Sequence, residues 1–312
     1  MKKFIIKTKW LWIICLIIVL FVLCFAVAKI IYIKSADTSW IEDLGYEADE
    51  LHTLKLDRAG CPMIPIEFDK EIYYFNFDTG CASDVVVTNV LENKIDYTIL
   101  GQTEQLNRDG SHRGWSYTVN INELVFFDSV HNNLNCSMID WKMSSSYKFN
   151  GLIGAGLFDN MVVTMDYRAG LIGVSAEVLD YSGLSKERYA VVPMLQTQTE
   201  GQENLIFFEC KLNGENIIVY IDTGKNVSYI HNPNSEYIIG ESTDKPNTAR
   251  VDAVIDVGNI SLTLPNVYEA NIPQYSDFSY PLAIELNSDQ FLKNDIVITF
   301  DFINNNLIFF KR

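Results

Sequence analysis

The sequence predicts an all-β protein of two homologous lobes that follow an N-terminal transmembrane helix. Three observations support this prediction. A long apolar segment lies near the start, short β-type segments fill the chain from about residue 60 onward, and one sequence pattern occurs twice among those segments. The order of these features divides the chain into a cytoplasmic stub and anchor at 1–35, a first lobe at 36–184 and a second lobe at 185–312.

The apolar segment runs from Trp10 to Ile33 and is interrupted only by Lys29. Its 24 residues exceed the roughly 20 that a helix needs to cross the hydrocarbon core of a membrane. Four lysines precede it, so the N-terminus should stay in the cytoplasm and the rest of the chain should face outward. A cleaved signal peptide remains an alternative, because a small-residue motif ending at Ala28 resembles a cleavage site. That alternative predicts a secreted protein, cleaved near Ala28.

Charge is distributed unevenly along the chain. Residues 1–35 hold six of the 24 basic residues and none of the 40 acidic ones. The remaining 18 basic and 40 acidic residues give the exported part a net charge of −22. Because such a surface repels phosphate groups, nucleic acid is not an expected partner. The 48% hydrophobic content is enough for a sizeable core, so the chain is not a disordered one.

The exported part consists mainly of short segments rich in Ile, Val, Phe, Tyr and Thr. Turns rich in Asn, Asp, Gly and Pro separate them, as is typical of a chain of β-strands. Apolar residues at helical spacing are scarce there, so we expect only short helices, near 90–93 and 289–294.

The repeated pattern is a β-type segment that runs into Asp-Thr-Gly, followed much later by a second β-type segment that ends in an aspartate. In the first half Asp78 and Asp166 are these aspartates, 88 residues apart; in the second half Asp222 and Asp301 are 79 residues apart. The matching order and spacing predict two homologous lobes. The polar stretch 175–204 is the natural connection, and we place the boundary near Ser185.

The two loops are Asp78-Thr79-Gly80 and Asp222-Thr223-Gly224. In each, glycine permits a close backbone approach and the threonine hydroxyl can hold the loop by hydrogen bonds. Two carboxylates that share a site repel each other, so the pKa of one rises and the pair shares a single proton. Such a pair offers a base and an acid to one water molecule, which is the requirement for peptide hydrolysis.

The segments around the first loop resemble those of the retropepsin-like and pepsin-like aspartic peptidases. The resemblance rests on 77–83, 150–158 and 162–172 and extends over about 60–312, with a weaker match in the second lobe. It implies a bilobal β fold whose cleft binds an extended peptide, with Asp78 and Asp222 as the catalytic residues. In that family two apolar residues and a glycine pack beneath the catalytic loop, a role that falls here to Leu152, Ile153 and Gly154.

The same family covers its cleft with a β-hairpin flap. The turn-rich segment 108–114, followed by Trp115 and Tyr117, lies where such a flap would come. Either aromatic side chain could touch the substrate, and either could instead serve packing.

The second lobe departs from the family pattern in two places. The segment 282–287 reads Leu-Ala-Ile-Glu-Leu-Asn, without the supporting glycine, so its turn must differ. After the loop glycine, where the family favours a small residue, the chain has Cys81 in the first loop and Lys225 in the second. Lys225 could hold both aspartates ionised and so remove the shared proton, or it could point to solvent without effect.

Other kinds of site have less support, and no metal or cofactor is expected. The four histidines are dispersed without a zinc motif, and the glycines at 151, 154 and 156 lack the spacing of a dinucleotide loop. Cys81 has no histidine near it in sequence, although spatial proximity leaves a cysteine peptidase open. The exported cysteines, which could form disulfides or remain free thiols, are Cys61, Cys81, Cys136 and Cys210.

The leading hypothesis is a membrane-anchored, outward-facing aspartic endopeptidase that hydrolyses extended segments of peptides or proteins. The membrane, through the N-terminal helix, and this substrate are the expected partners, and the exported part is expected to be a monomer. One alternative is a catalytically silent relative that keeps the cleft to bind peptides or a partner protein. Another is a pair of separate lobes that find their partners by dimerisation.

Overall fold

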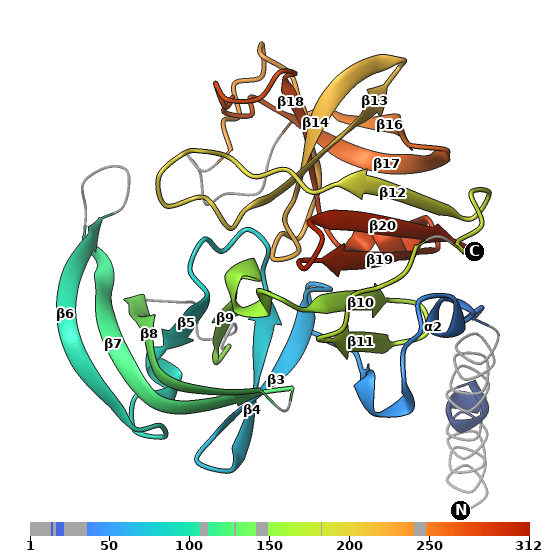
Figure 1. The fold of residues 1–312 in the computed structure, drawn as a ribbon. Helices are drawn as coiled ribbons and strands as arrows, with labels where there is room; N and C mark the ends of the chain where they lie inside the picture. The colour runs from blue at the N-terminus through green and yellow to red at the C-terminus, as the bar shows by residue number, and fades with distance from the viewer. Residues whose placement is uncertain are drawn as a thin grey trace, which may run out of the picture.

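The computed structural model describes residues 14, 17–21, 36–106, 112–127, 129–141, 149–181, 183–239 and 248–312. These residues are mostly in β-strands, which form three sheets, one of them a closed barrel (Figure 1). The all-β prediction is therefore confirmed. The division into lobes at 184/185 stays a prediction.

The predicted membrane span, Trp10 to Ile33, falls almost entirely outside the described residues. Of this segment the structure describes only Ile14 and 17–21, which are helical. Within the described part of the chain, no helix is long and apolar enough to cross a membrane. Both the anchor and the alternative of a cleaved signal peptide therefore stay predictions.

The first half of the chain forms an eight-stranded sheet in the order β2-β3-β4-β9-β5-β8-β7-β6. A further pairing of β3 with β7, through Glu67 and Val125, curls the sheet on itself. Residues along β3 alternate between buried and half-buried, because one face of the strand packs on the core. The strands are β2 (Lys55–Leu56), β3 (Pro62–Phe68), β4 (Glu71–Phe77), β5 (Val85–Thr88), β6 (Tyr97–Leu106), β7 (His112–Phe126), β8 (Ser129–Trp141) and β9 (Gly151–Ile153).

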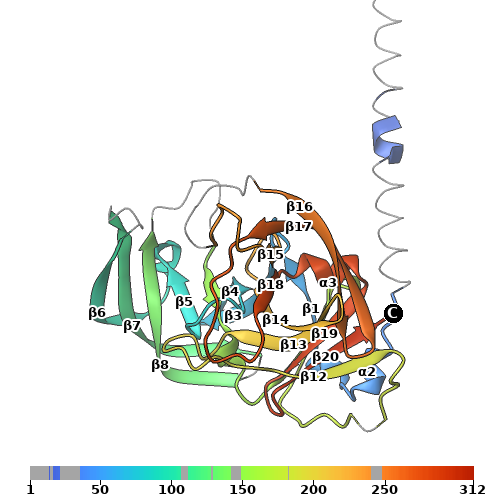
Figure 2. The same ribbon diagram turned by 90° about the horizontal axis from the view of Figure 1, so that it is seen from above.

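The second half forms a closed barrel in the order β13-β14-β18-β15-β17-β16. Closure leaves no free strand edge in the barrel and encloses an apolar interior. Figures 1 and 2 show β6 and β7 at the end of the molecule remote from β16 and β17. The barrel strands are β13 (Ile206–Leu212), β14 (Glu215–Ile221), β15 (Tyr229–His231), β16 (Arg250–Val257), β17 (Ile260–Ala270) and β18 (Leu282–Leu286).

A six-stranded sheet, in the order β1-β11-β10-β19-β20-β12, joins the two halves. At its centre β10 and β19 pair in antiparallel fashion, with Thr164 opposite Thr299 and their buried hydroxyls 2.7 Å apart. These strands are the two closing segments of the sequence repeat, so the repeat corresponds to a pseudo-twofold arrangement. The strands are β1 (Leu51–Thr53), β10 (Val162–Asp166), β11 (Leu171–Ser175), β12 (Tyr189–Pro193), β19 (Ile296–Asp301) and β20 (Asn306–Lys311).

The two closing aspartates make the same turn in both halves. Asp166 Oδ1 accepts a hydrogen bond from the backbone N–H of Ala169 at 2.8 Å, and Asp301 Oδ1 accepts one from Asn304 at 2.9 Å. A carboxylate that bonds its own backbone in this way stabilises a tight turn. The sequence repeat thus extends to individual hydrogen bonds.

Helices in the described residues are short, as predicted. Helices lie at both expected positions, η2 near 90–93 and α3 near 289–294. After residue 35 the helices are α2 (Trp40–Asp43), η1 (Ala48–Glu50), η2 (Asn89–Leu91), η3 (Ala155–Phe158) and α3 (Asp289–Lys293).

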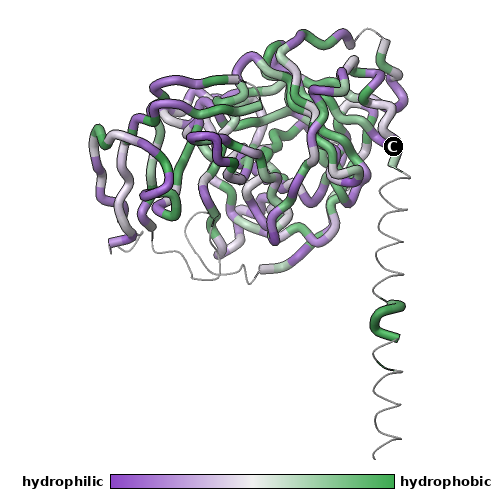
Figure 3. The backbone as a smooth tube through the Cα atoms, turned by 90° about the horizontal axis from the view of Figure 1, so that it is seen from below, coloured by the Kyte–Doolittle hydropathy of each residue, from purple (hydrophilic) through white to green (hydrophobic). Residues whose placement is uncertain are grey.

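The core extends across both halves beneath the loop that carries Asp78. The ring of Phe77 packs edge-on against Phe158, with centroids 4.7 Å apart, and against Phe300 at 5.9 Å. Figure 3 shows apolar stretches running through the central strands, with polar stretches mainly in the peripheral loops. The segment after the predicted anchor packs into a second, separate apolar cluster, where the indole of Trp40 is fully buried and donates to Asp166 at 3.0 Å.

Candidate active site

Both aspartates of the Asp-Thr-Gly loops follow matching strands. Asp78 comes directly after β4 and Asp222 directly after β14, and each strand pairs in parallel with a short strand of its own sheet. The backbone N–H of Asp78 donates to Ile153 O at 2.9 Å, and that of Asp222 donates to Leu286 O at 2.9 Å. The two halves therefore fix their aspartates by the same backbone contact.

Each carboxylate is oriented by the glycine of its own loop. The N–H of Gly80 donates to Asp78 Oδ1 at 2.9 Å, and the N–H of Gly224 donates to Asp222 Oδ1 at 3.1 Å. Backbone donors cannot rotate away as a side chain can. The direction of both carboxylates is thus set by the loop backbone.

The glycines also show how close the two carboxylates lie. A methyl group added to Gly80 would lie 2.6 Å from Cγ of Asp222, and one added to Gly224 would lie 2.3 Å from Cγ of Asp78. Real Cβ atoms do not approach other atoms so closely, so each loop needs a residue without a side chain here. Each loop therefore packs against the carboxylate of the other, and the fold brings both aspartates to one site.

The threonines tie the two loops together. The hydroxyl of Thr79 donates to Ile221 O at 2.7 Å and accepts the N–H of Thr223 at 3.1 Å. In return the hydroxyl of Thr223 donates to Phe77 O at 2.7 Å and accepts the N–H of Thr79 at 3.0 Å. Both threonines are fully buried. We expected these hydroxyls to hold their own loops, but each holds the opposite loop, which a tripeptide motif alone does not reveal.

The two carboxylates affect each other electrostatically. Burial and the neighbouring Asp222 raise the pKa of Asp78 from 3.8 to about 7. A hydrogen bond with Asp222 acts in the same direction, whereas the N–H of Gly80 and the cation of Lys225 act against it. At neutral pH and below, Asp78 can therefore keep a proton next to a second carboxylate.

Support beneath the first loop is apolar and tightly packed. Ile153 is fully buried, and the N–H of Gly154 donates to Asp84 O at 2.9 Å. A methyl group on Gly154 would lie 2.2 Å from Ser83 O and 2.5 Å from Cys81 O. The glycine predicted beneath the loop is thus required there by two backbone carbonyls.

The second loop has a polar support instead. Asn287 follows Leu286, so it takes the position that Gly154 has after Ile153, and it is buried. Its carboxamide donates to Lys225 O at 3.3 Å and accepts from the Ser228 hydroxyl at 2.9 Å, and the same hydroxyl accepts the N–H of Asn287 at 3.0 Å. The supporting turn therefore differs between the halves. In the first half, backbone carbonyls pack directly against Gly154; in the second, the side-chain amide of Asn287 occupies the corresponding space.

Lys225 points to the dyad and not to solvent. Its Nζ lies 3.4 Å from Asp222 Oδ2 and forms an ion pair with Glu285, whose side chain is only 7% exposed. Burial alone would lower the pKa of Lys225, but the carboxylates of Asp222 and Glu285 raise it above its ordinary value. Lys225 is therefore a cation that two carboxylates share.

Sequence reasoning missed Glu285, Asn287 and Ser228. Glu285 pairs with Tyr220 in the parallel β14–β18 register, as Leu152 pairs with Asn76 in β4–β9. It thus occupies the position of Leu152, the first apolar residue of the family motif. A lone glutamate in an otherwise apolar buried strand needs a cation nearby, and that signal was present in the sequence.

The predicted flap residues lie on β7, which pairs with β6 to form a long hairpin. The tip at 107–111 lies outside the described residues. The ring of Trp115 packs against His112 with centroids 5.8 Å apart, and Tyr117 packs partly buried against the main apolar core. Contact of either aromatic side chain with a substrate stays a prediction.

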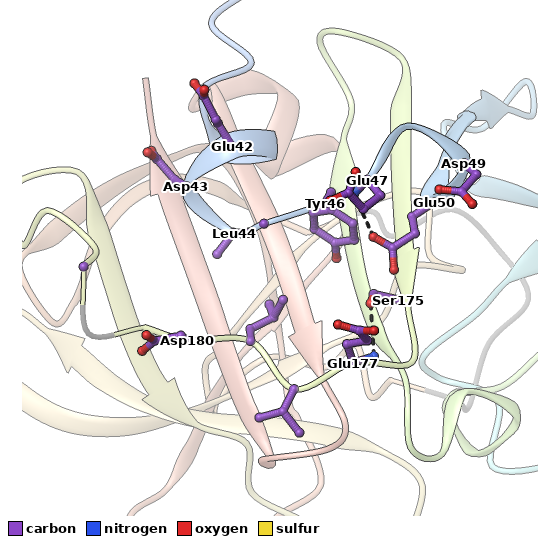
Figure 4. A pocket seen from close by; sticks show the side chains of 14 residues that line it. Glu42, Asp43, Leu44, Tyr46, Glu47, Asp49, Glu50, Ser175, Glu177 and Asp180 are labelled. Atoms are coloured by element: carbon purple, nitrogen blue, oxygen red, sulfur yellow. Dashed lines mark hydrogen bonds between the residues drawn. The ribbon is translucent and has the colours of Figure 1, made fainter.

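A hollow lies elsewhere, where α2 and η1 approach the end of β11 (Figure 4). Its volume is about 720 Å³, and half of its 14 lining residues are acidic. Several of these acids have structural tasks: Glu47 and Glu50 close a capping box around η1, and Asp43 accepts the hydroxyl of Tyr189 at 2.7 Å. We assign no chemistry to this hollow.

The four cysteines after residue 35 are free thiols in the structure, so none of them forms a disulfide. Cys61 lies near the dyad and donates to Gly224 O at 3.3 Å, while Cys81 donates to Ser83 O at 3.3 Å. Burial, aided by nearby carboxylates, raises the pKa of each of these two thiols to about 12. Neither thiol is thus activated as a nucleophile, which weakens the cysteine-peptidase alternative.

In the described ranges, no group of three or more His, Cys, Asp and Glu side chains is placed to hold a metal ion. Comparison of the chain with models of known protein families gave no match. Comparison with curated proteins gave no significant match either.

Proposed function

We propose that the chain is an aspartic endopeptidase of the bilobal, pepsin-like and retropepsin-like kind, with Asp78 and Asp222 as its catalytic residues. The observation that carries this proposal is the contact of each loop glycine with the opposite aspartate, which puts two carboxylates into one site. The reciprocal bonds of Thr79 and Thr223 support it, because they give the two carboxylates one rigid frame. Both carboxylates come from one chain, so the dyad does not require dimerisation of separate lobes.

The reaction uses one ionised and one protonated carboxyl group. The ionised group takes a proton from water as the water oxygen attacks the scissile carbonyl carbon, and the other group gives its proton to the carbonyl oxygen. The tetrahedral intermediate then receives a proton on nitrogen from the first group. The C–N bond breaks as the second group recovers a proton from one hydroxyl. One water molecule is consumed, and both carboxyl groups return to their starting states.

The protonation of Asp78 fits this scheme. Because its pKa is raised to about 7, the pair can hold the required single proton at neutral and acidic pH. As pH rises through about 7, the proton is lost and both groups become carboxylates that cannot protonate the substrate. Activity should therefore decline on the alkaline side near pH 7.

An extended peptide or protein segment is the proposed substrate, bound under the β6–β7 hairpin that carries Trp115 and Tyr117. An extended backbone can pair with strand edges, so binding would depend little on sequence. In this proposal the N-terminal segment anchors the enzyme in the membrane, and the catalytic part works on the outer side as a monomer without a metal or cofactor.

A catalytically silent peptide-binding relative is the second candidate, and Lys225 is the observation that favours it. A cation 3.4 Å from Asp222 could stabilise two negative charges and so remove the shared proton. Glu285 argues against this outcome, because its own carboxylate already pairs with Lys225. We therefore rank the peptidase first.

Hydrolysis by the full-length chain in detergent tests the proposal. The wild-type protein should cleave members of a mixed library of fluorogenic peptides between pH 4 and 8. Asp78→Asn and Asp222→Asn should each lower kcat/KM by about 10⁴-fold, because neither retains the acid–base pair. The matched control is Asp69→Asn, which lies exposed in a turn with a φ of 50° that asparagine tolerates.

Cleavage that survives in either dyad variant would refute the assignment. If all the proteins are inert over this pH range, the silent relative is favoured. In that case wild-type protein and Asp78→Asn should still bind the same peptides, measured by fluorescence anisotropy.

A further inference from the structure

The surroundings of the two catalytic carboxylates differ in charge. Asp222 has the Lys225 cation 3.4 Å from its Oδ2, while its Oδ1 accepts the N–H of Gly224. Asp78 has Cys81 in the position that corresponds to Lys225, and the Cys81 thiol donates to Ser83 O and not to the dyad. A positive charge therefore acts more directly on one carboxylate than on the other.

Glu285 fixes the position of this cation. A lysine side chain has four rotatable bonds and moves readily to solvent, but the Lys225 side chain is only 29% exposed and its ammonium is held by Glu285. Glu285 is on β18, directly beneath the loop, and its side chain is 7% exposed. Burial disfavours both charges, since it raises the pKa of Glu285 and by itself would lower that of Lys225; the attraction between the two side chains opposes both effects.

Glu285 also limits what the cation can do. An unpaired lysine beside two aspartates could balance a second negative charge and so keep both ionised. With Glu285 ionised, one positive charge faces the carboxylates of Glu285 and Asp222, and a third negative charge on Asp78 would be unbalanced. The pair can therefore direct the charge to Asp222 without removing the proton from Asp78.

Three further titratable groups near the dyad, two thiols and one phenol, are neutral. Burial raises the pKa of Cys61 and of Cys81 to about 12, and burial together with Asp222 and Asp78 raises the pKa of Tyr220 further above its ordinary value. These groups therefore add no charge at working pH. In the described part of the chain, two charged side chains change the pKa of Asp78: Asp222 raises it and Lys225 lowers it.

We propose that Lys225, held by Glu285, is a positioning residue that assigns the two roles of the dyad, with Asp222 as the ionised base and Asp78 as the protonated acid. This inference rests on the proposed peptidase function, since it names roles in that reaction. It goes beyond that function because the Asp-Thr-Gly repeat by itself makes the two aspartates equivalent. The chain breaks this equivalence with one charge pair that is present in one half only.

The pH profile of kcat/KM for the full-length chain tests this assignment. In Lys225→Met, loss of the cation should move the acid limb and the alkaline limb of the profile to higher pH, each by about one unit. An opposite charge at this distance typically shifts a titration by that amount or more. Well below the midpoint of the acid limb, the activity should fall by up to about tenfold. Lys225→Arg keeps the charge and should restore the wild-type shape of the profile, whatever its rate.

Two controls separate this role from a merely structural one. The double variant Lys225→Met/Glu285→Leu removes the Glu285 carboxylate together with its cation, so it should unfold cooperatively in a thermal melt, at a temperature closer to wild type than that of Lys225→Met, while keeping the displaced profile. In a second control, carboxyl ¹³C NMR at pH 6 should show the proton on Asp78 in wild-type protein and shared between both aspartates in Lys225→Met. This readout does not depend on turnover.

The outcomes distinguish the two proposals. If wild-type protein cleaves peptides and Asp78→Asn does not, but Lys225→Met and the double variant keep the wild-type limbs, the peptidase stands and the role of Lys225 is refuted. If wild-type protein is inert, the peptidase proposal fails. The NMR result then still decides whether Lys225 places the charge on Asp222.

Discussion

The two Asp-Thr-Gly loops make nearly the same backbone hydrogen bonds and have different supports. Asp78 and Asp222 are held by equivalent hydrogen bonds from their own N–H groups, and the threonines exchange equivalent bonds between the loops. Beneath the loops, however, the first half has Leu152 and Gly154 where the second has Glu285 and Asn287. The comparison shows that the fold requires the loop geometry and tolerates more than one way to support it.

The different supports lead to different chemistry. The apolar support leaves Asp78 to the effects of burial and of its partner carboxylate, which raise its pKa. The polar support carries a buried glutamate, which holds a lysine beside Asp222. Two halves that share one loop geometry can thus place their aspartates in different electrostatic surroundings, as the proposed division into acid and base requires.

The largest expected effect concerns what the loops share. Gly80→Ala and Gly224→Ala each place a methyl group within 2.6 Å of the opposite carboxylate, so the two aspartates must separate. Displacement by about 1 Å at a reacting group costs on the order of 10²-fold in rate. We expect both variants to lose at least that factor in kcat/KM, with equal losses for the two loops. If only one of the two variants loses kcat/KM, the two aspartates depend on the opposite loop to different degrees, despite their matching backbone contacts.

The matched control for the glycine variants is Gly214→Ala, in the β13–β14 turn, where an added methyl group meets nothing within 4 Å. Its φ of 86° causes some strain but leaves the dyad untouched. This variant should lose stability in a thermal melt and keep its kcat/KM.

The next effect separates the two supports. Gly154→Ala drives a methyl group against two backbone carbonyls that cannot yield, so the free energy of unfolding should fall by about 3 kcal/mol. Asn287→Ala removes the partner of Lys225 O and of the Ser228 hydroxyl, which should cost about 2 kcal/mol. Urea denaturation of the full-length chain in detergent measures both. Asn287→Gly should be no more stable than Asn287→Ala. If Asn287→Ala has the same free energy of unfolding as wild type, the role given to the amide is refuted.

The last and smallest energy, the coupling within the charge pair itself, requires variants of both partners. Removal of either Lys225 or Glu285 alone leaves a poorly solvated charge, and we expect a loss of about 2 kcal/mol, less than for a fully buried pair because Lys225 is 29% exposed. The double variant Lys225→Met/Glu285→Leu should recover more than half of that loss. A double-mutant cycle gives the coupling energy.

The exposed pair Lys293–Asp289 on α3 is the control for this cycle. Its side chains are 42% and 41% exposed, so its coupling energy should be below about 0.5 kcal/mol. If the Lys225–Glu285 coupling is equally small, the two supports would differ in composition but not in energy.

Much of the site was predictable from the sequence because it depends on local patterns. Alternating apolar residues and frequent turn residues predict β-strands, since side chains alternate between the two faces of a strand. The duplicated Asp-Thr-Gly motif selects Asp78 and Asp222, and the same repeat marks Asp166 and Asp301. The segment 152–154 was also found, because its apolar-apolar-glycine pattern is local.

Tertiary structure alone decided the contacts between residues far apart in the chain. That Thr79 bonds the loop of Thr223, 144 positions away, follows from the pseudo-twofold packing and not from either motif. The direction of Lys225 was open in the sequence, because a surface lysine and a paired lysine look the same there. The sequence by itself determined two strand ends that each carry an aspartate. The fold brings the two aspartates together, and Glu285, by holding Lys225 beside Asp222, makes their electrostatic surroundings unequal. The physical reason is that charge and packing act over a few ångströms in space, whatever the separation along the chain.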